Sequence, residues 1–180
     1  MSEDNLLGKE NDGWRVAITT LMHERANIAA LVYASFKREL REVVALARRL
    51  TKNGRPLSED PRVRSRLVHF YGVAETMRLN NLRMRAGKNA ADDPGPIGSI
   101  FKLIWASANQ AMTGLAAEVL GPEAELLSGP GAELGGHGAW LKRYLRSLAN
   151  SIEGGTSEIL RGVVAERVLG FGRTLAKGAS

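Results

Sequence analysis

Between positions 14 and 50, apolar residues recur at intervals of mostly three, four or seven, which is the spacing of one face of an α-helix. Asp12 precedes this segment and is expected to accept hydrogen bonds from the first free amides, whereas Gly54 and Pro56 follow it, where a helix should stop. The apolar face consists of Leu21, Ile28, Val32, Phe36, Leu40, Val43, Val44 and Ala47. A long amphipathic helix of this kind is typical of a helical bundle.

Four further segments have helical features. A second helix is expected from Pro61, capped by Asp60, and a third from about Ile97 to Leu120. A short helix should follow over residues 139–148, and a last one should begin at Thr156 and end near Leu169. The predicted apolar positions are Val63, Leu67, Phe70, Tyr71, Ala74, Met77 and Leu82 in the second helix, and Ile100, Ile104, Ala108, Ala111, Leu115 and Val119 in the third.

The connections between these helices are rich in glycine and proline. The segments 87–98 and 121–138 therefore predict loops, and no segment is convincing as a strand. The predicted fold class is all-α, an up-and-down four-helix bundle with an additional short helix. Its expected limits are a lead-in over residues 1–12, the bundle over 13–172 and a tail over 173–180.

Composition excludes several classes of function. The 180 residues include no cysteine, which excludes disulfides and thiolate metal sites, and the three histidines have no partner at metal-ligand spacing. The net charge of +6 fits either an arginine-rich solvated surface or a polyanionic partner such as a phosphate-bearing cofactor. No nucleic-acid-binding motif, secretory signal or membrane-spanning run accompanies it. We expect a cytoplasmic protein that binds neither nucleic acid nor membrane.

The most specific motif lies near the end of the chain, in the sequence SIEGGTSEILRGVVAERVLGFGR. It resembles YEGTSEIQRxxIAxxxLG, the C-terminal signature of the flavin-dependent acyl-CoA dehydrogenases. The opening NLLGKENDGWRVAITTLMHERANIA resembles the family's passage from its middle β-domain into the first helix of its C-terminal bundle. GRPLSEDPRVRSRL resembles the family's GRPLxxxxxVRxxL turn. The resemblance covers almost the whole chain and corresponds to the C-terminal domain alone.

The resemblance implies an oxidoreductase that acts on the CH–CH group of acyl-CoA thioesters. In the family, a carboxylate removes the α-proton of the thioester while the β-hydrogen leaves as hydride to FAD. Electron-transfer flavoprotein is the electron acceptor that the family implies, and the bundles of the family assemble into oligomers. The alternative is a non-catalytic helical module for oligomerisation, or a partner subunit of a heteromeric acyl-CoA dehydrogenase.

The resemblance also implies site residues. Many members place the catalytic base directly before the Gly-Thr of the signature, where this chain has Gly154. A subgroup that includes isovaleryl-CoA dehydrogenase places the base before an arginine on the first bundle helix, which is the position of Glu24. Glu24 is therefore the predicted base and Glu153 the second choice. Arg25 matches a substrate-site arginine, and Thr156 and Glu158 match positions that contact FAD.

Two flavin-contacting motifs of the family are replaced in this sequence. Residues 50–54, Leu-Thr-Lys-Asn-Gly, occupy the place of RxxFG, whose arginine meets the FAD of a neighbouring subunit. Arg48 and Arg49 are the alternatives for that arginine. A longer loop that begins at Leu120-Gly121-Pro122-Glu123 replaces the family's QxxGGxG segment.

Overall fold

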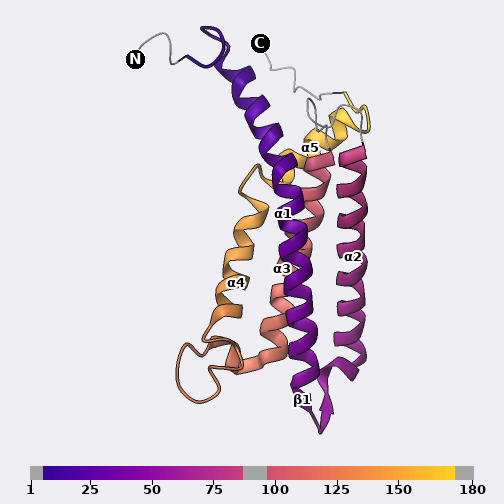
Figure 1. Ribbon diagram of the computed structural model, residues 1–180, viewed down its shortest axis with the longest axis vertical. Coiled ribbons are helices and arrows are strands. Elements are labelled where there is room, and N and C mark those ends of the chain that lie inside the picture. The colour runs from indigo at the N-terminus through magenta and orange to yellow at the C-terminus, as the bar shows by residue number, and fades with distance from the viewer. Residues whose placement is uncertain (1–5, 87–96, 173–180) are drawn as a thin grey trace, which may run out of the picture.

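A computed structural model shows an up-and-down bundle of four helices with a fifth helix at one end (Figure 1). It describes residues 6–86 and 97–172, and the side chains of residues 22–30 and 85 lie outside that description. The α-helices are α1 (Gly13–Arg49), α2 (Pro61–Ala86), α3 (Ile97–Leu120), α4 (Ala139–Leu148) and α5 (Ser157–Arg167). Short elements join them: β1 (Thr51–Lys52), β2 (Arg55–Pro56) and the 3-10 helices η2 (Leu57–Glu59), η3 (Gly121–Glu125) and η4 (Ala149–Ser151). The predicted fold class is confirmed.

Helix α3 is the centre of the packing, because it contacts each of the other four α-helices. Its Met112 and Leu115 are fully buried, and they share one apolar core with Phe36 of α1, and with Phe70 and Met77 of α2. Each such side chain contributes about 1.5–3 kcal/mol by leaving water. The bundle is therefore stabilised by the contacts that α1, α2 and α4 make with α3.

The predicted caps differ in outcome. Asp60 caps α2 as expected, since its Oδ1 accepts hydrogen bonds from the amides of Arg62 at 2.8 Å and Val63 at 3.3 Å. Asp12 does precede α1, but its carboxylate caps no amide and instead pairs with Arg15 one turn later. The predicted cap at Asp12 is therefore wrong, because the guanidinium competes for the same oxygens.

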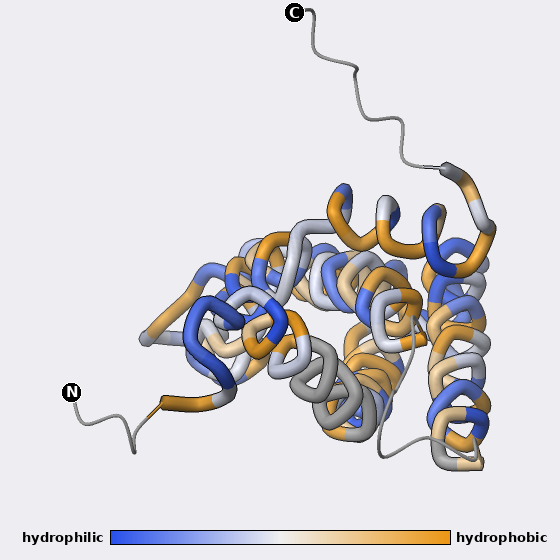
Figure 2. The backbone as a smooth tube through the Cα atoms, turned by 90° about the horizontal axis from the view of Figure 1, so that it is seen from above, coloured by the Kyte–Doolittle hydropathy of each residue, from blue (hydrophilic) through white to orange (hydrophobic). Residues whose placement is uncertain are grey.

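Several predicted core positions are exposed. Tyr71 and Leu82 of α2 are 63% and 52% exposed, and Leu21 and Ala111 also lie at the surface. Helix α2 stands at the edge of the bundle, with neighbours on one side (Figure 1). Seen from above, apolar residues also lie on the outer sides of the helices (Figure 2). The apolar residues of α2 therefore lie on two faces of the helix, and the other helices of the bundle bury only one of these faces.

A β-hairpin with strands of two residues each lies between α1 and α2, so the prediction of no strand is wrong here. Thr51 pairs with Pro56 and Lys52 with Arg55 in antiparallel register. The two residues between the strands, Asn53 and Gly54, have φ values of +53° and +76°. Asn-Gly favours this turn because both residues tolerate a left-handed backbone.

The glycine-rich connection from α3 to α4 is irregular, as predicted. After η3, it continues as a series of turns up to Gly138, which precedes α4. The predicted loop over residues 87–98 joins α2 to α3; its residues 87–96 lie outside the described part of the chain, and Ile97 and Gly98 already belong to α3.

Candidate functional site

Three of the five predicted site residues lie on one segment at the end of the bundle where α1 begins (Figure 1). Helix α4 ends there, η4 continues its direction, and residues 152–156 turn the chain into α5. Glu153 stands before this turn, Thr156 ends it and Glu158 lies in the first turn of α5. Glu153 therefore precedes the turn, and Thr156 and Glu158 lie together at the beginning of α5.

Thr156 sets the beginning of α5. It has an extended backbone, and its Oγ1 accepts a hydrogen bond from the amide of Ile159 at 3.4 Å, as an N-cap residue does. From α3, Lys102 donates through Nζ to the carbonyl oxygen of Gly155 at 2.7 Å. The turn is thereby tied to the central helix just before the free amides of α5.

The carboxylate of Glu158 is stabilised in its charged form. A hydrogen bond from its own amide, followed by one from the Thr156 hydroxyl, lowers its pKa below the usual glutamate value. The positive charges of Arg161 and Lys102 act in the same direction. The Glu158 side chain is exposed, so this end of α5 presents a carboxylate to its surroundings, whereas Thr156 and Lys102 are half-buried.

The backbone at position 154 favours glycine. Gly154 has φ +64° and Gly155 has φ +101°, which are conformations that other residues rarely adopt. A Cβ atom added at Gly154 would meet no other atom within 4 Å, so space is not what excludes a side chain. A glutamate at this position would instead strain the backbone.

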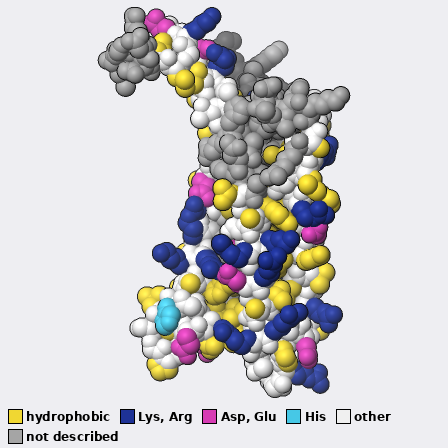
Figure 3. Space-filling view, in the orientation of Figure 1, with side chains coloured by type: hydrophobic (Ala, Val, Ile, Leu, Met, Phe, Trp, Pro, Cys, Tyr) yellow, Lys and Arg dark blue, Asp and Glu magenta, His cyan; other side chains and the backbone are white. Residues whose placement is uncertain are grey.

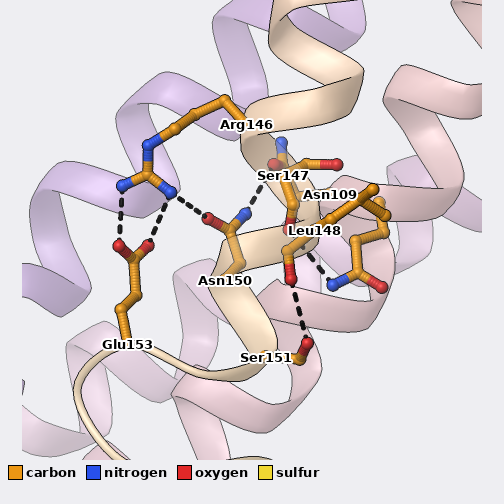
Figure 4. A network of polar contacts seen from close by, with 8 residues as sticks. Asn109, Arg146, Ser147, Leu148, Asn150, Ser151 and Glu153 are labelled. Carbon is orange, nitrogen blue, oxygen red and sulfur yellow. Dashed lines mark hydrogen bonds and ion pairs between the residues drawn. The ribbon is translucent and has the colours of Figure 1, made fainter.

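Glu153, the second choice for the base, is held by an arginine. Arg146 of α4 binds both of its carboxylate oxygens, at 2.7 and 3.1 Å, and also reaches Oδ1 of Asn150 at 3.4 Å (Figure 4). The Glu153 side chain is 43% exposed, and the ion pair raises the pKa of Arg146, first through the hydrogen bond and then through the opposite charge. In this position Glu153 anchors the turn to α4.

A chain of buried amides continues from this anchor into the bundle. Asn150 donates through Nδ2 to Oδ1 of Asn109 on α3 at 2.9 Å (Figure 4). Asn109 in turn donates to Oε2 of Glu39 on α1, also at 2.9 Å. Thr113 and Ser147 join α3 to α4 beside it through a hydrogen bond of 3.2 Å. These contacts fix the end of α4, and with it the direction in which the turn leaves.

The other two predicted residues lie on the first half of α1. The backbone of Glu24 and Arg25 is helical, but their side chains are outside the described residues, so the structure does not test the predicted base. The first turns of α1 extend past the other helices at the same end of the bundle as α5 (Figure 1).

Two hollows lie elsewhere. A groove of about 290 Å³ runs between α1 and α2, with Lys37, Arg41, Arg48 and Tyr71 among its lining residues, and a hollow of about 480 Å³ borders the hairpin. Arg49 faces the loop before α4 and donates to the carbonyl oxygen of Leu134 at 3.3 Å.

Within the described ranges, no three histidine or acidic residues gather as metal ligands. Among the same residues, no helix is apolar enough over sufficient length to cross a membrane.

Sequence reasoning missed the residues that hold this segment in place. Lys102 and Gly155 are 53 positions apart, and Asn109 and Asn150 are 41 apart. Polar residues on a helix carry no local signal for such long-range pairs. Thr156 could be predicted because a threonine directly before a helical segment is a local capping signal.

Comparisons with known proteins agree on one family. Residues 11–169 match the family model described as acyl-CoA dehydrogenase, C-terminal domain. The chain is 36% identical over 177 residues to acyl-CoA dehydrogenase IpdE1 of Mycobacterium tuberculosis, covering 97% of this chain and 42% of that protein. It is 31% identical to acyl-CoA dehydrogenase FadE26 of the same organism, covering 94% and 42%. The chain thus spans about two fifths of the length of these curated relatives.

Solved structures share the fold. Butyryl-CoA dehydrogenase from Megasphaera elsdenii superposes with a TM-score of 0.77 at 19% identity, over 94% of this chain and 42% of that one. A chain of the ChsE4–ChsE5 complex from Mycobacterium tuberculosis superposes with a TM-score of 0.75 at 27% identity, over 93% and 43%.

Proposed function

The chain belongs to the acyl-CoA dehydrogenase family, in which it matches the C-terminal helical domain, and we propose that it serves α,β-dehydrogenation of acyl-CoA thioesters. The observation that carries the proposal is the match over residues 11–169 to a domain of relatives that are named acyl-CoA dehydrogenases. The activity is that of the complete enzyme, to which this chain contributes the helical bundle.

The proposed base is Glu24, which removes the proton from the α-carbon of the thioester. Two observations support this choice over Glu153. The position that usually holds the base is occupied by Gly154, where the backbone disfavours a glutamate. Both carboxylate oxygens of Glu153 are bound by Arg146. Arg25, next to Glu24 in α1, is proposed to bind the substrate. A carboxylate enclosed with substrate in a dry pocket has a raised pKa, which suits proton abstraction.

The beginning of α5 fits the polar part of FAD. The Thr156 hydroxyl donates to Glu158 and keeps a lone pair that can accept, and the Glu158 carboxylate also accepts, so this pair suits hydroxyl and amino groups better than phosphate. Thr156 and Glu158 are therefore proposed to hold the cofactor through such groups. When bound, the flavin supplies the acceptor for the hydride that leaves the β-carbon.

The proposed partners are acyl-CoA, electron-transfer flavoprotein as electron acceptor, and further subunits in a homo- or hetero-oligomer. The ChsE4–ChsE5 structure, a complex of two chains by its name, supports assembly with a second subunit. We place the enzyme in the cytoplasm, which agrees with a chain without cysteine. The names of the relatives favour the enzyme over a non-catalytic module.

The first test is substitution of the proposed base in a complete enzyme, in which this chain is combined with the remaining domains of its relatives. Glu24→Gln should lower turnover of an acyl-CoA by about 10²–10⁴-fold while flavin absorbance is retained, because the amide cannot accept the proton. Glu153→Gln is the matched control and should keep most of the activity. Loss of turnover in Glu153→Gln with full turnover in Glu24→Gln would transfer the role to Glu153.

A second test concerns the cofactor. The same enzyme should show the absorbance of bound flavin, and Thr156→Ala should lower its affinity for FAD. A colourless protein that binds a dehydrogenase subunit would instead support the non-catalytic module.

A further inference from the structure

The turn between η4 and α5 has little rigidity of its own. It contains two adjacent glycines in left-handed conformations, Gly154 at φ +64° and Gly155 at φ +101°. Glycine loses more conformational freedom on ordering than any other residue. Thr156 and Glu158, the residues proposed to hold the cofactor, follow this turn. Their positions therefore depend on contacts that come from elsewhere in the bundle.

Two fixed points enclose the beginning of α5. After it, the side chain of Leu160 is fully buried, and α5 packs against α3. Before it, Nζ of Lys102 on α3 donates to the carbonyl oxygen of Gly155 at 2.7 Å. Residues 156–158 therefore lie between a buried side chain and a hydrogen bond from the central helix.

Of the two side chains that anchor the turn, Lys102 forms the stronger contact. The other contact, from Arg146 to Glu153, joins side chains that are 61% and 43% exposed, and ion pairs at the surface contribute little to stability. Lys102 and Gly155 are both half-buried, and a charged donor strengthens a hydrogen bond to a carbonyl oxygen. Lys102 also holds the main chain directly before Thr156, whereas Arg146 binds a side chain earlier in the turn.

We infer that Lys102 is a positioning residue for the cofactor, which it serves by holding Thr156 and Glu158 in place without contacting FAD itself. This role rests on the proposed function, in which these two residues bind FAD. A turn that is already ordered loses less conformational entropy when a ligand binds, so the affinity for the ligand rises. The hydrogen bonds from its own amide and from Thr156, and the charge of Arg161, lower the pKa of Glu158 more than the charge of Lys102 does. The main effect of Lys102 is therefore its hydrogen bond to the turn.

Amide hydrogen exchange of the chain without cofactor measures the positioning itself. The amides of Ile159 and Leu160 donate to Oγ1 and to the carbonyl oxygen of Thr156, so they report the order of the first turn of α5. Lys102→Met should speed their exchange about 10-fold, and Lys102→Arg, which keeps a charged donor, should restore most of the protection. Lysine and arginine side chains are spread along the face of the bundle in Figure 3, so the control must remove a charge without removing this contact. Lys142→Met does so at an exposed position of α4 and should leave the exchange unchanged.

Titration of the flavin-free complete enzyme with FAD, followed by flavin absorbance, measures the consequence for the cofactor. Lys102→Met should raise the dissociation constant of FAD about 10-fold, and Lys102→Arg should restore most of the affinity. Arg146→Met should have a smaller effect than Lys102→Met, because its ion pair with Glu153 is exposed. Turnover of Lys102→Met at saturating FAD should stay close to that of the unmodified enzyme, because a positioning residue takes no part in the chemistry.

The two measurements distinguish the role of Lys102 from the proposed function. A complete enzyme that binds no flavin would overturn both. An enzyme that binds FAD, with the same affinity in Lys102→Met as in the unmodified form, would overturn the role of Lys102 alone. Weaker FAD binding in Lys102→Met with unchanged hydrogen exchange would show that Lys102 contacts the cofactor directly, and would also overturn its role as a positioning residue.

Discussion

The two halves of α1 differ in what surrounds them. In the second half, Phe36, Val43 and Ala47 are fully buried against the other long helices, whereas Trp14 and Leu31 in the first half are 80% and 73% exposed. The proposed base lies on the first half. Among the described side chains of α1, the fully buried ones therefore lie in the second half, whereas the proposed chemistry lies on the first.

The largest expected effect on stability is in the packed half. Phe36→Ala removes a fully buried aromatic ring from the core and should lower the free energy of unfolding by about 3–5 kcal/mol. Leu31→Ala, on the same helix but 73% exposed, should change it by less than about 0.5 kcal/mol. Urea denaturation followed by circular dichroism measures both. Similar losses in the two variants would contradict the division of α1 into a packed and an exposed half.

An intermediate effect is expected in the buried amide chain, which reaches the packed half of α1 at Glu39. Asn109→Ala leaves the Asn150 amide and the Glu39 carboxylate without this partner and should cost about 1–3 kcal/mol. Asn150→Ala provides the second side of a double-mutant cycle. If the chain acts as a unit, the double variant loses less than the sum of the single losses. Additive losses would mean that the two amides contribute independently.

The smallest effect is expected at the beginning of α5 and depends on pH. The pKa of Glu158 is lowered in the folded state, so its carboxylate contributes stability above the usual glutamate pKa and loses that contribution as pH falls through the lowered value. The difference in thermal midpoint between the native chain and Glu158→Gln should therefore be present at pH 7 and disappear in strong acid. Added salt should reduce it, because the group is exposed. A difference that grows on acidification would reverse the assigned direction.

Local sequence signals predicted the helices well. The spacing of apolar residues placed α3, and Asp60 and Thr156 marked the beginnings of α2 and α5 because a cap acts on its own helix. The hairpin also has a local signal, the Asn53-Gly54 pair, although Gly54 predicted only the end of the first helix. Periodicity could not assign Tyr71 or Leu82 to the outer face, because which side of α2 is covered depends on where α1 and α3 pack.

The candidate site was predictable to a smaller extent. The family signature located Glu153, Thr156 and Glu158 on one segment, which lies at the end of the bundle where α1 begins (Figure 1). The contacts that hold this segment come from Lys102 of α3, which binds Gly155, and from Arg146 of α4, which binds Glu153, and they depend on how the helices are placed around the turn. Glu24 and Arg25 stay predictions, because their side chains are outside the described residues.

The left-handed turn at Gly154 and Gly155 also bears on how this protein can change during evolution. A single mutation that introduced glutamate at position 154 would place a residue with a Cβ atom in the left-handed backbone conformation. That conformation costs L-residues about 1–2 kcal/mol. The flanking anchors, Arg146 on Glu153 and Lys102 on Gly155, resist a shift of the backbone that would relieve it. A descendant with a carboxylate at this position would therefore need compensating changes in the anchors, so such a change is difficult to make in one step.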